Sequence, residues 1–483
     1  MAERQFDRRR FVTGLGLLAA SPWLSACGAG TPRRVAVVGA GLAGLTAAWE
    51  LRDAGVEVRL FEGSERPGGR VWTLRNPFGD GLPIDAGAMS AGSDYRHWRG
   101  FCDRLGLAIE EVLMPTPRPD TLVRLAGSTV RGSDLRQDPD RWPLDLHPAE
   151  KPLAPFRLLS HYLRPLAEEI GQVEGVMAPE CAAYDRLSLL ELLQQQGASP
   201  AALGLIEHSL NYNRLSTVSA LSALRDFLRR LGDSGIALRL KDGQGALPEA
   251  MAAGLGGAIT YRRKLNAVVR DGDGLRLVFA SPGGEETYRA ARVILTLPFT
   301  ALRQVEFEPP LPAERQRMID DLPYTQVAKT FIPTKRRFWL ADGKFSVLYS
   351  DSKFERLFDL SEGEGSRGLL LNWINGAGLA EFSQLSAERH SDQVVEWLAT
   401  LWPEAADACE AAMTINWAST YAQGAYAHYA PGQLQAFASA IPQPIGPIHF
   451  AGEHTELVAP GLEGAMTSGI RTSAEVVAAL APG

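Results

Sequence analysis

The stretch 35–62 constrains the fold more than any other part of the chain. Residues 35–38 form a short β-branched run, and residues 39–44 follow it at once with the spacing G-x-G-x-x-G. Residues 45–54 then have a helical pattern that ends at a glycine, and residues 56–61 alternate as a second strand. This order of strand, glycine turn, helix and strand predicts a parallel βαβ unit that binds a dinucleotide at the turn.

The residues that we predict to touch the dinucleotide lie inside this turn. Gly39 permits a tight turn, Gly41 lets backbone N–H groups approach a pyrophosphate, and Gly44 lets the helix pack close to the strand. With Leu42 and Ala43 they form the predicted phosphate cradle. A glycine-tolerant turn without a ligand is the alternative interpretation.

Glu62 ends the second strand of this unit. A carboxylate at that position accepts hydrogen bonds from the 2′-hydroxyl of a ribose and repels a 2′-phosphate. The expected ligand is therefore an unphosphorylated adenine dinucleotide rather than NADP. A chain of 483 residues is long enough for two or three domains, and this unit begins one of them.

The N-terminus predicts an export signal rather than a part of the fold. Arg8 and Arg9 precede an apolar run over residues 11–26, which is too short and too interrupted by glycine and proline to span a bilayer comfortably. The pattern Arg-Arg-x-Phe resembles bacterial twin-arginine signals. The run ends in L-S-A-C-G, which resembles a lipoprotein box that acylates Cys27; a plain cleavage site with an incidental cysteine is the alternative. We expect residues 1–27 to be an export signal with a lipobox, and the protein to be periplasmic and lipid-anchored to the membrane.

Composition argues against several other classes of protein. The formal net charge of -7 and the lack of a basic block argue against a nucleic-acid partner. Besides Cys27, the cysteines Cys102, Cys181 and Cys409 are widely spaced and odd in number, so they indicate neither a disulfide framework nor a metal site. We expect these three to be small core residues.

The middle of the chain changes from helical to β-rich sequence. Residues 95–232 have mainly helical patterns, residues 115–155 are expected to be irregular, and residues 258–298 have the pattern of short strands. The candidate helices cover residues 98–105, 155–170, 188–195, 201–210 and 218–231. This order predicts an α/β fold in which a Rossmann-type domain is interrupted by a mixed α+β substrate-binding domain with a helical insert.

Further motifs place polar or small residues where a ligand could bind. The turn E-R-P-G-G-R carries Arg70 just beyond the second strand, where a guanidinium can neutralise pyrophosphate charge. The small-residue stretch 84–89 permits close approach to a flat ring. Lys329 lies on an alternating stretch and faces either the interior or solvent. Residues 448–455 run into an acidic turn, before a final helix expected over residues 467–480.

Together these motifs resemble the flavin amine oxidase superfamily, which includes monoamine, polyamine and L-amino acid oxidases. The resemblance covers residues 35–480. It rests on the opening fingerprint through Glu62, on G-G-R at 68–70, on Lys329 with Trp339 ten residues later, and on the closing F-A-G-E-H-T with L-E-G-A. It implies that the cofactor is FAD.

The resemblance also implies which residues contact FAD. Glu62 lies on the adenosine ribose, Arg70 on the phosphates and Leu265 near adenine. The residues implied beside the flavin and its ribityl chain are Gly87, Ala88, Met89, Ser90, Glu453, Leu462, Glu463, Gly464 and Ala465. The other cofactor-binding residues are Gly39, Gly41, Leu42, Ala43, Gly44 and Gly69.

The implied domains are discontinuous. The FAD-binding domain covers residues 33–90, 240–300 and 440–483, and the substrate-binding domain with its helical insert covers residues 91–239 and 301–439. The sequence does not determine the oligomeric state, so a homodimer stays open.

The implied reaction is the oxidation of an amine. The neutral amine gives a hydride from its α-carbon to flavin N5, the imine hydrolyses to an aldehyde or ketone, and O2 is reduced to H2O2. Lys329 matches the family lysine that hydrogen-bonds a water near N5, and Tyr426 matches one wall of an aromatic cage that guides the amine. These are the two predicted catalytic residues.

Three departures from the family pattern refine this expectation. Ala425 stands where monoamine oxidases carry the cysteine that attaches FAD, so noncovalent FAD is expected. Gly461 stands where the second cage aromatic would lie. Ser90 replaces the arginine with which L-amino acid oxidases hold the α-carboxylate. An α-amino acid is therefore disfavoured unless another arginine substitutes, and a primary or secondary amine or a polyamine is the leading substrate class.

Other functions stay open. An L-amino acid oxidase is one alternative, and a desaturase or protoporphyrinogen-type flavin oxidoreductase is another, although Lys329 and Tyr426 argue against the latter. A non-enzymatic flavoprotein of the envelope is a third. The electron acceptor is also open, because a periplasmic enzyme could use a quinone or a cytochrome instead of O2.

Overall fold

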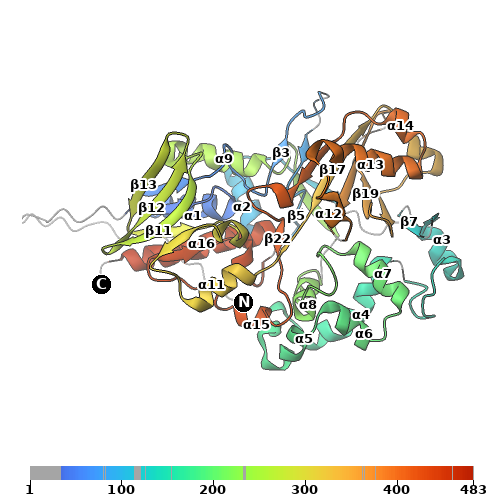
Figure 1. Ribbon diagram of the computed structural model, residues 1–483, viewed down its shortest axis with the longest axis horizontal. Coiled ribbons are helices and arrows are strands. Elements are labelled where there is room, and N and C mark those ends of the chain that lie inside the picture. Colours follow the sequence, from blue (N-terminus) through green and yellow to red (C-terminus); the bar gives the residue numbers. More distant parts are fainter. Residues whose placement is uncertain are drawn as a thin grey trace, which may run out of the picture.

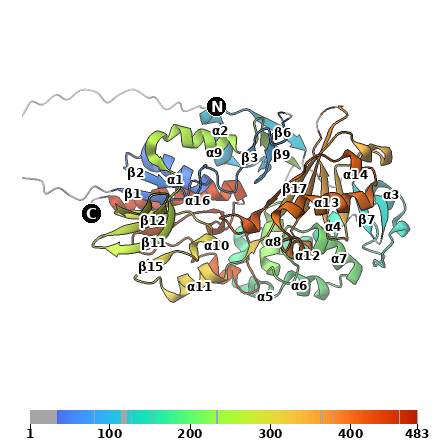
Figure 2. The ribbon, with the colours of Figure 1, turned by 45° about the horizontal axis from the view of Figure 1, so that its top comes forward.

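The computed structural model describes residues 34–481 except 80, 82, 114–120, 126, 154, 232–234, 362, 364, 376 and 460. The expected export signal, with Cys27, lies outside the described residues. The described chain has a mixed α/β structure with several sheets. Both ribbon views show the parallel sheet at one end and a larger mixed sheet with a group of helices at the other (Figures 1 and 2).

A five-stranded sheet, parallel throughout, contains the glycine turn. Its order is β10 (Ile259–Thr260), β2 (Val58–Phe61), β1 (Val35–Val38), β14 (Arg292–Leu295) and β23 (Ile448–Phe450). Strands from three distant segments therefore form one sheet. All four residues of β1 are buried, which explains their unbroken apolar sequence.

Two helices pack side by side against this sheet, namely α1 (Leu42–Asp53) and the final helix α16 (Gly461–Leu480). Their approach is very close, since a Cβ at Gly469 would lie 2.5 Å from the carbonyl oxygen of Ala43. Figure 1 shows α16 in red beside the blue α1. The first and last helices of the described chain thus build one layer over the parallel sheet.

A four-stranded sheet lies at the same end of the molecule (Figure 1). Its order is β13 (Gly284–Ala290), β12 (Gly274–Ser281), β11 (Lys264–Asp271) and β15 (Glu306–Glu308). The first three strands form an antiparallel meander, and β15 joins β11 in parallel. Helices α9 (Ala246–Gly254) and α2 (Arg96–Leu105) pack against each other, and both contact helices of the parallel-sheet layer.

A seven-stranded sheet forms the other end of the molecule. Its order is β21 (Met413–Asn416), β17 (Ala328–Thr334), β20 (Gly368–Ile374), β19 (Arg356–Asp359), β18 (Val347–Ser350), β7 (Leu122–Leu125) and β8 (Ser128–Arg131). Every residue of β17 is buried, and the helix α13 (Ala387–Leu401) contacts both β17 and β21.

A helical group packs beside this sheet (Figure 2). It contains α4 (Pro155–Ile170), α5 (Ala182–Arg186), α6 (Leu189–Gln195), α7 (Pro200–Ser209) and α8 (Ala220–Leu228). Side-chain caps start several of them, because Ser188, Ser199 and Ser219 accept hydrogen bonds from first-turn N–H groups. The expectation of helices in this part of the chain is confirmed.

Short strands join the two ends of the molecule. The pairs are β3 (Thr73–Leu74) with β4 (Ile84–Asp85), and β16 (Tyr324–Thr325) with β22 (Tyr426–Ala427); β9 (Ile236–Leu240) pairs with β5 (Ala91–Gly92) and β6 (Ile109–Leu113). Segments far apart in sequence therefore meet between the parallel and the seven-stranded sheets.

Some expected boundaries were wrong. The final helix begins at Gly461 instead of residue 467, and the carboxylate of Glu463 in its first turn is held by the backbone N–H groups of His97 and Trp98. The stretch 115–155, expected to be irregular, contains β7, β8 and α3 (Gly132–Gln137).

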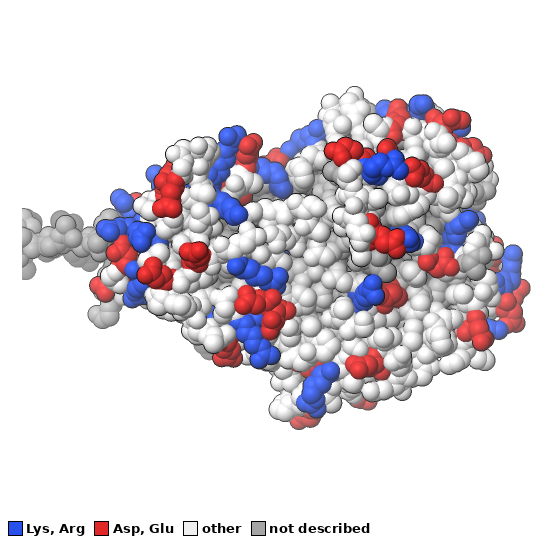
Figure 3. Space-filling model, in the orientation of Figure 1, with Lys and Arg blue, Asp and Glu red and all other residues white. Residues whose placement is uncertain are grey.

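Charged side chains of both signs alternate over the face shown in Figure 3, and its middle carries few of them. Among the described residues, no group of three His, Cys, Asp or Glu side chains could hold a metal ion. No described helix is both long and apolar enough to cross a bilayer.

Candidate functional site

The glycine turn leaves a cradle at the start of α1. Gly39 has φ +109°, and a Cβ there would lie 2.4 Å from Thr296 Oγ1; a Cβ at Gly44 would lie 1.9 Å from the carbonyl oxygen of Gly39. Both glycines are therefore needed by the polypeptide itself. Apart from its two neighbours in the chain, no described residue has an atom within 4 Å of a Cβ built at Gly41, so the turn is open there. The first N–H groups of α1, including those of Leu42 and Ala43, have no side-chain cap and are available to an anion.

Glu62 links the end of β2 to this turn. Its carboxylate accepts hydrogen bonds from the backbone N–H groups of Ala40 (2.7 Å) and Ser64 (2.8 Å), and the residue is 8% exposed. Each oxygen keeps a lone pair for a further donor. Nearby, Arg263 N donates to the carbonyl oxygen of Glu62, and β11 then leads to the buried Leu265.

Arg70 and Glu453 form an ion pair between the first and last parts of the chain. Arg70 Nη1 lies 2.7 Å from Glu453 Oε1 and also donates to the carbonyl oxygen of Ala425. Burial disfavours the guanidinium charge, but Glu453 and Tyr324 together outweigh this effect and raise the pKa of Arg70. Glu453 also accepts from Ala427 N. The pair places the G-G-R turn, containing Gly69, beside the segment that carries Tyr426.

The stretch after β4 lies against the same turn. A Cβ at Gly87 would lie 2.0 Å from the carbonyl oxygen of Arg70, so only glycine fits. Ala88 N donates to that same oxygen. The residues that follow are Met89, which is partly buried, and Ser90. This stretch is thus fixed beside Arg70.

Lys329 faces the interior and reaches this stretch. It is 2% exposed, and its Nζ donates to the carbonyl oxygens of Gly87 and Asp85 (3.2 Å). Nζ also lies 4.8 Å from the ring centroid of Trp373. Burial lowers the pKa of Lys329 to about 7, although the carboxylate of Asp85 opposes this shift. Both protonation states of this amine are therefore accessible near neutral pH.

This lowered pKa predicts how stability depends on pH. Between about pH 7 and the ordinary value of 10.5, Lys329 binds a proton in the unfolded but not in the folded state. Its contribution to stability is therefore smallest below pH 7 and grows by up to about 1.4 kcal/mol per pH unit above it. We expect the free energy of unfolding of the wild type, relative to that of Lys329→Met, to rise by on the order of 2 kcal/mol from pH 7 to pH 9.

Denaturant unfolding of the two FAD-bound proteins at both pH values measures this difference. Lys335→Met is the matched control, because Lys335 lies just beyond the same strand and is exposed. The difference in the free energy of unfolding between Lys335→Met and the wild type should not show this rise between pH 7 and pH 9. A flat difference for Lys329→Met as well would show that Lys329 has the same pKa in both states.

Tyr426 lies on β22, next to Ala425 and the Arg70–Glu453 pair. Its hydroxyl donates to the main-chain oxygen of Asn211 (2.8 Å), and burial raises its pKa. Trp417 lies near the same stretch and donates from Nε1 to the carbonyl oxygen of Ala86 (3.0 Å). Aromatic rings and Lys329 thus approach the segment 86–87 from the seven-stranded sheet side.

The C-terminal motif lies in the first turn of α16. The carboxylate of Glu463 accepts from the backbone N–H groups of His97 (2.8 Å) and Trp98 (3.0 Å), at the start of α2. A Cβ at Gly464 would lie 2.3 Å from the carbonyl oxygen of Ala459. The carboxylate of Glu463 therefore holds the start of α2 and is not directed to a ligand.

Most of the predicted site residues thus fall into two clusters of contacting residues. One group joins Glu62 to the glycine turn, and the other joins Arg70, Glu453, Gly87 and Lys329. Sequence reasoning missed Trp373, Asn211 and Arg356, which lie in no motif. The strand register brings Trp373 opposite both Lys329 and Arg356, and hydrogen bonds from Arg356 and Tyr426 join Asn211 to them.

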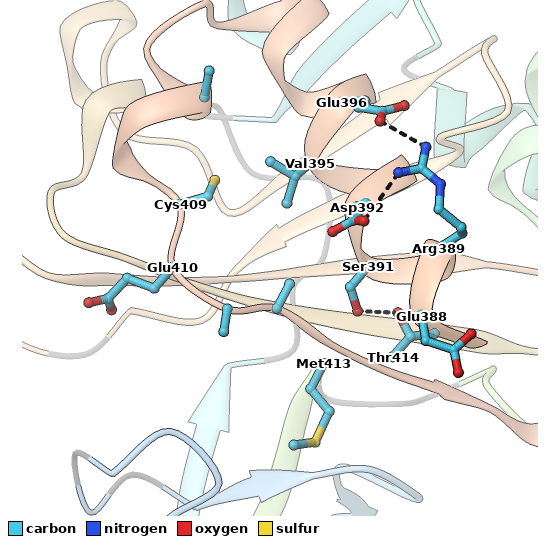
Figure 4. Close-up of a pocket in the computed structure, with 13 residues that line it drawn as sticks. Glu388, Arg389, Ser391, Asp392, Val395, Glu396, Cys409, Glu410, Met413 and Thr414 are labelled. Atoms are coloured by element: carbon cyan, nitrogen blue, oxygen red, sulfur yellow. Dashed lines mark hydrogen bonds and ion pairs between the residues drawn. The ribbon is translucent and has the colours of Figure 1, made fainter. Parts of the chain in front are cut away.

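Two hollows in the surface lie apart from these groups. The larger, of about 700 Å³, is lined by α13 and by residues 406–414. Figure 4 shows Arg389 there, paired with Asp392 and Glu396. Cys409 also lines it, and burial raises the pKa of its thiol to about 11. The second, of about 250 Å³, is lined by residues that include Asn213 and Gln326 but neither predicted catalytic residue.

The open cradle at Gly41, the uncapped N–H groups and the buried acid Glu62 fit the pyrophosphate and ribose of FAD. The fold and these donors define a dinucleotide-binding oxidoreductase. A family model described as flavin containing amine oxidoreductase matches residues 42–477, and the chain belongs to this family. It is a flavin-dependent enzyme that binds FAD.

The chain is similar to L-amino-acid oxidases in sequence and to amine oxidases of known structure. An L-amino-acid oxidase of Demansia vestigiata is 26% identical over 463 residues, which cover 92% of this chain and 87% of that protein. An L-amino-acid oxidase of Siganus canaliculatus is 28% identical, with coverages of 92% and 85%. A putrescine oxidase structure with bound putrescine matches with a TM-score of 0.78 and 26% identity, covering 92% of this chain and 99% of that chain. Cyclohexylamine oxidase from Brevibacterium oxydans IH-35A has the same fold, with a TM-score of 0.77, 23% identity, and coverages of 93% and 100%.

Proposed function

We propose that this enzyme oxidises a primary or secondary amine, or a polyamine, to an imine in a site beside Lys329 and Tyr426. The observation that carries the proposal is the buried Nζ of Lys329, held at the carbonyl oxygen of Gly87 beside the Arg70–Glu453 pair. A lysine is seldom fully buried without a functional reason, because its charge loses hydration. Bound FAD supplies the two-electron acceptor for the amine.

The side chains of this chain bind and orient the amine and control its proton. The rings of Trp373, Trp417 and Tyr426 offer faces that attract an ammonium group. With a pKa of about 7, Lys329 can hold or release a proton at Nζ near neutral pH. The apolar surroundings that lower this pKa also keep bulk water away from the reacting amine.

The FAD is proposed to be bound noncovalently, by the residues predicted from the sequence. Glu62 would accept hydrogen bonds from the adenosine ribose, and the cradle from Gly39 to Gly44 would bind the pyrophosphate. Arg70 would neutralise the phosphate charge. The discontinuous division into an FAD-binding and a substrate-binding domain is part of this proposal. It is supported by the parallel sheet, whose strands come from all three parts of the proposed FAD-binding domain.

An L-amino acid oxidase is the second candidate. It is favoured by the names of the curated relatives, which are L-amino-acid oxidases, whereas the structural neighbours are amine oxidases. Ser90 is the observation that disfavours it, because the arginine of the family pattern is missing there.

The experiment that tests the proposed function is product stoichiometry in air. A primary amine, O2 and H2O should give one aldehyde, one NH3 and one H2O2 for each O2 consumed. Consumption of amine with a quinone or cytochrome as acceptor, but no peroxide, would identify a dehydrogenase. Neither product from any amine, with FAD bound, would reject amine oxidation and favour a desaturase-type reaction.

We further propose export by the twin-arginine route and lipid attachment at Cys27. The proposal rests on the residues Arg8 to Cys27 alone, which lie outside the described chain. In a bacterial host with the lipoprotein pathway, we expect the wild type in the membrane fraction and Cys27→Ser in the soluble periplasm. Release of the wild type into the soluble fraction would favour a plain cleavage site.

A further inference from the structure

Four residues are aligned across the middle of the seven-stranded sheet. Lys329 on β17 lies opposite Trp373 on β20, Trp373 lies opposite Arg356 on β19, and Arg356 lies opposite Tyr349 on β18. Residues directly opposite each other in a sheet point to the same face. All four side chains therefore lie on the face from which Lys329 reaches Gly87.

Arg356 is a buried cation on this face, and no described acidic side chain forms an ion pair with it. It is 4% exposed, and its Nη1 donates to Asn211 Oδ1 (2.7 Å). Within the described part of the chain, its Nε and Nη2 have no hydrogen-bond partner. The neighbouring acid, Glu355, accepts instead from the backbone N–H groups of Asn375 and Gly378.

Other buried arginines of the chain show how such a charge is normally satisfied. Arg315 donates to three main-chain carbonyl oxygens, those of Ala440, Ile441 and Gln443. Arg225 pairs with Asp226 at 2.8 Å. A buried guanidinium with only part of its donors satisfied is costly, because the remaining N–H groups have lost their hydration without gaining an acceptor. Two free N–H donors in a fixed fork match the geometry of a carboxylate.

Arg356 also lies close to the proposed catalytic residues. Asn211 bridges them, since its side chain accepts from Arg356 and its main-chain oxygen accepts from the hydroxyl of Tyr426. The ring centroid of Trp373 lies 4.8 Å from Lys329 Nζ and 5.5 Å from Arg356 Cζ. The ammonium and the guanidinium are therefore within about 10 Å of each other. This separation is comparable to the length of a small molecule that carries an amine and a second polar group.

We propose that Arg356 binds a carboxylate carried by the amine substrate, so that the substrate is an amino carboxylate. This inference rests on the proposed amine oxidation. Arg356, on β19, would then take the role of the arginine that the family pattern places at position 90, where this chain has serine. The carboxylate can stand on the reacting carbon or at the end of a short chain, and both sources present the same anion to the guanidinium.

A set of five-carbon amines separates these cases. Pentylamine has a neutral end, 1,5-diaminopentane a cationic end and 5-aminopentanoate an anionic end, while L-norvaline carries its carboxylate on the reacting carbon. The rate of anaerobic flavin reduction is measured with each. Pentanoate, which has no amine, is titrated separately against the visible spectrum of the bound flavin, so that anion binding is observed without turnover.

We expect one of the two amino carboxylates to reduce the wild type most efficiently. In Arg356→Gln, the ratio of the flavin-reduction rate with that amino carboxylate to the rate with pentylamine should fall by about 10- to 100-fold. Pentanoate should bind more weakly by a similar factor. Arg356→Lys, which keeps the charge but not the fork, should lose less. A preference for L-norvaline places the carboxylate on the reacting carbon, and a preference for 5-aminopentanoate places it at the far end.

Arg315→Gln is the control for loss of a buried arginine outside the site. It should lower stability and leave the ranking of the four amines unchanged. The proposal is overturned if the wild type prefers pentylamine or 1,5-diaminopentane, or if pentanoate binds equally well to Arg356→Gln. If no amine reduces the flavin but pentanoate binding still depends on Arg356, the amine oxidation fails and the anion site stands.

Discussion

Gly44→Ala is expected to yield protein without FAD. The new Cβ would lie 1.9 Å from the carbonyl oxygen of Gly39 and 3.0 Å from Thr296 Oγ1. Gly39 and Thr296 directly follow β1 and β14 of the parallel sheet, so α1 must move away from β1. Such overpacking costs typically about 1–3 kcal/mol, and here it also distorts the phosphate cradle. The flavin-to-protein ratio of the purified protein measures the loss.

Gly41→Ala separates loss of the cofactor from loss of the fold. Nothing in the described chain lies within 4 Å of that Cβ, so the polypeptide tolerates the methyl group, which would occupy the place proposed for the pyrophosphate. We expect a folded protein with at least about tenfold weaker FAD binding, or about 1.4 kcal/mol. Gly204→Ala on the exposed side of α7 should leave FAD content unchanged. Full FAD occupancy in Gly44→Ala would contradict the proposed cradle.

Lys329→Met is expected to slow the reduction of bound flavin by an amine by about 100- to 10,000-fold, the range typical of a group that transfers protons. FAD should stay bound, because Lys329 contacts the carbonyl oxygens of Asp85 and Gly87 but not the glycine turn. In the wild type the rate should rise as pH increases through about 7, where Lys329 loses its proton.

Rapid-mixing measurements of anaerobic flavin reduction from pH 6 to pH 9 test this expectation. The step near pH 7 should be absent from Lys329→Met and present in Lys335→Met. A Lys329→Met protein that keeps half of the wild-type rate would show that this lysine has no part in the reduction of the flavin.

Local sequence signals predicted the opening βαβ unit and several helices of the middle of the chain well. The β-branched run of β1, the glycine turn and the alternation of β2 are each recognisable without a partner strand, and α4 begins and ends where its apolar spacing indicated. The candidate helices near residues 98–105 and 188–195 differ from α2 and α6 by only one or two residues. These elements depend mainly on neighbours in sequence.

Tertiary contacts decided what the sequence left open. Whether Lys329 faces the interior depends on its register with Trp373, since β17 is buried on both faces and its pattern does not distinguish them. Nothing in the sequence around Arg356 indicated a binding residue, because its burial and its two unsatisfied N–H donors arise only in the folded chain. The first turn of α16 was missed for a similar reason: Glu463 is held there by the N–H groups of α2, which lies far away in sequence.

The measurement that tests the central claim most directly is anaerobic bleaching of the visible flavin absorption, because it does not depend on the electron acceptor. Purified protein is mixed with monoamines, polyamines and amino carboxylates in the absence of O2, and air is admitted afterwards. Bleaching by at least one amine that is fast in the wild type and slow in Lys329→Met is predicted, with recovery of the absorption in air if O2 is the acceptor. No bleaching by any amine, in protein that carries its full complement of FAD, would contradict the proposed function.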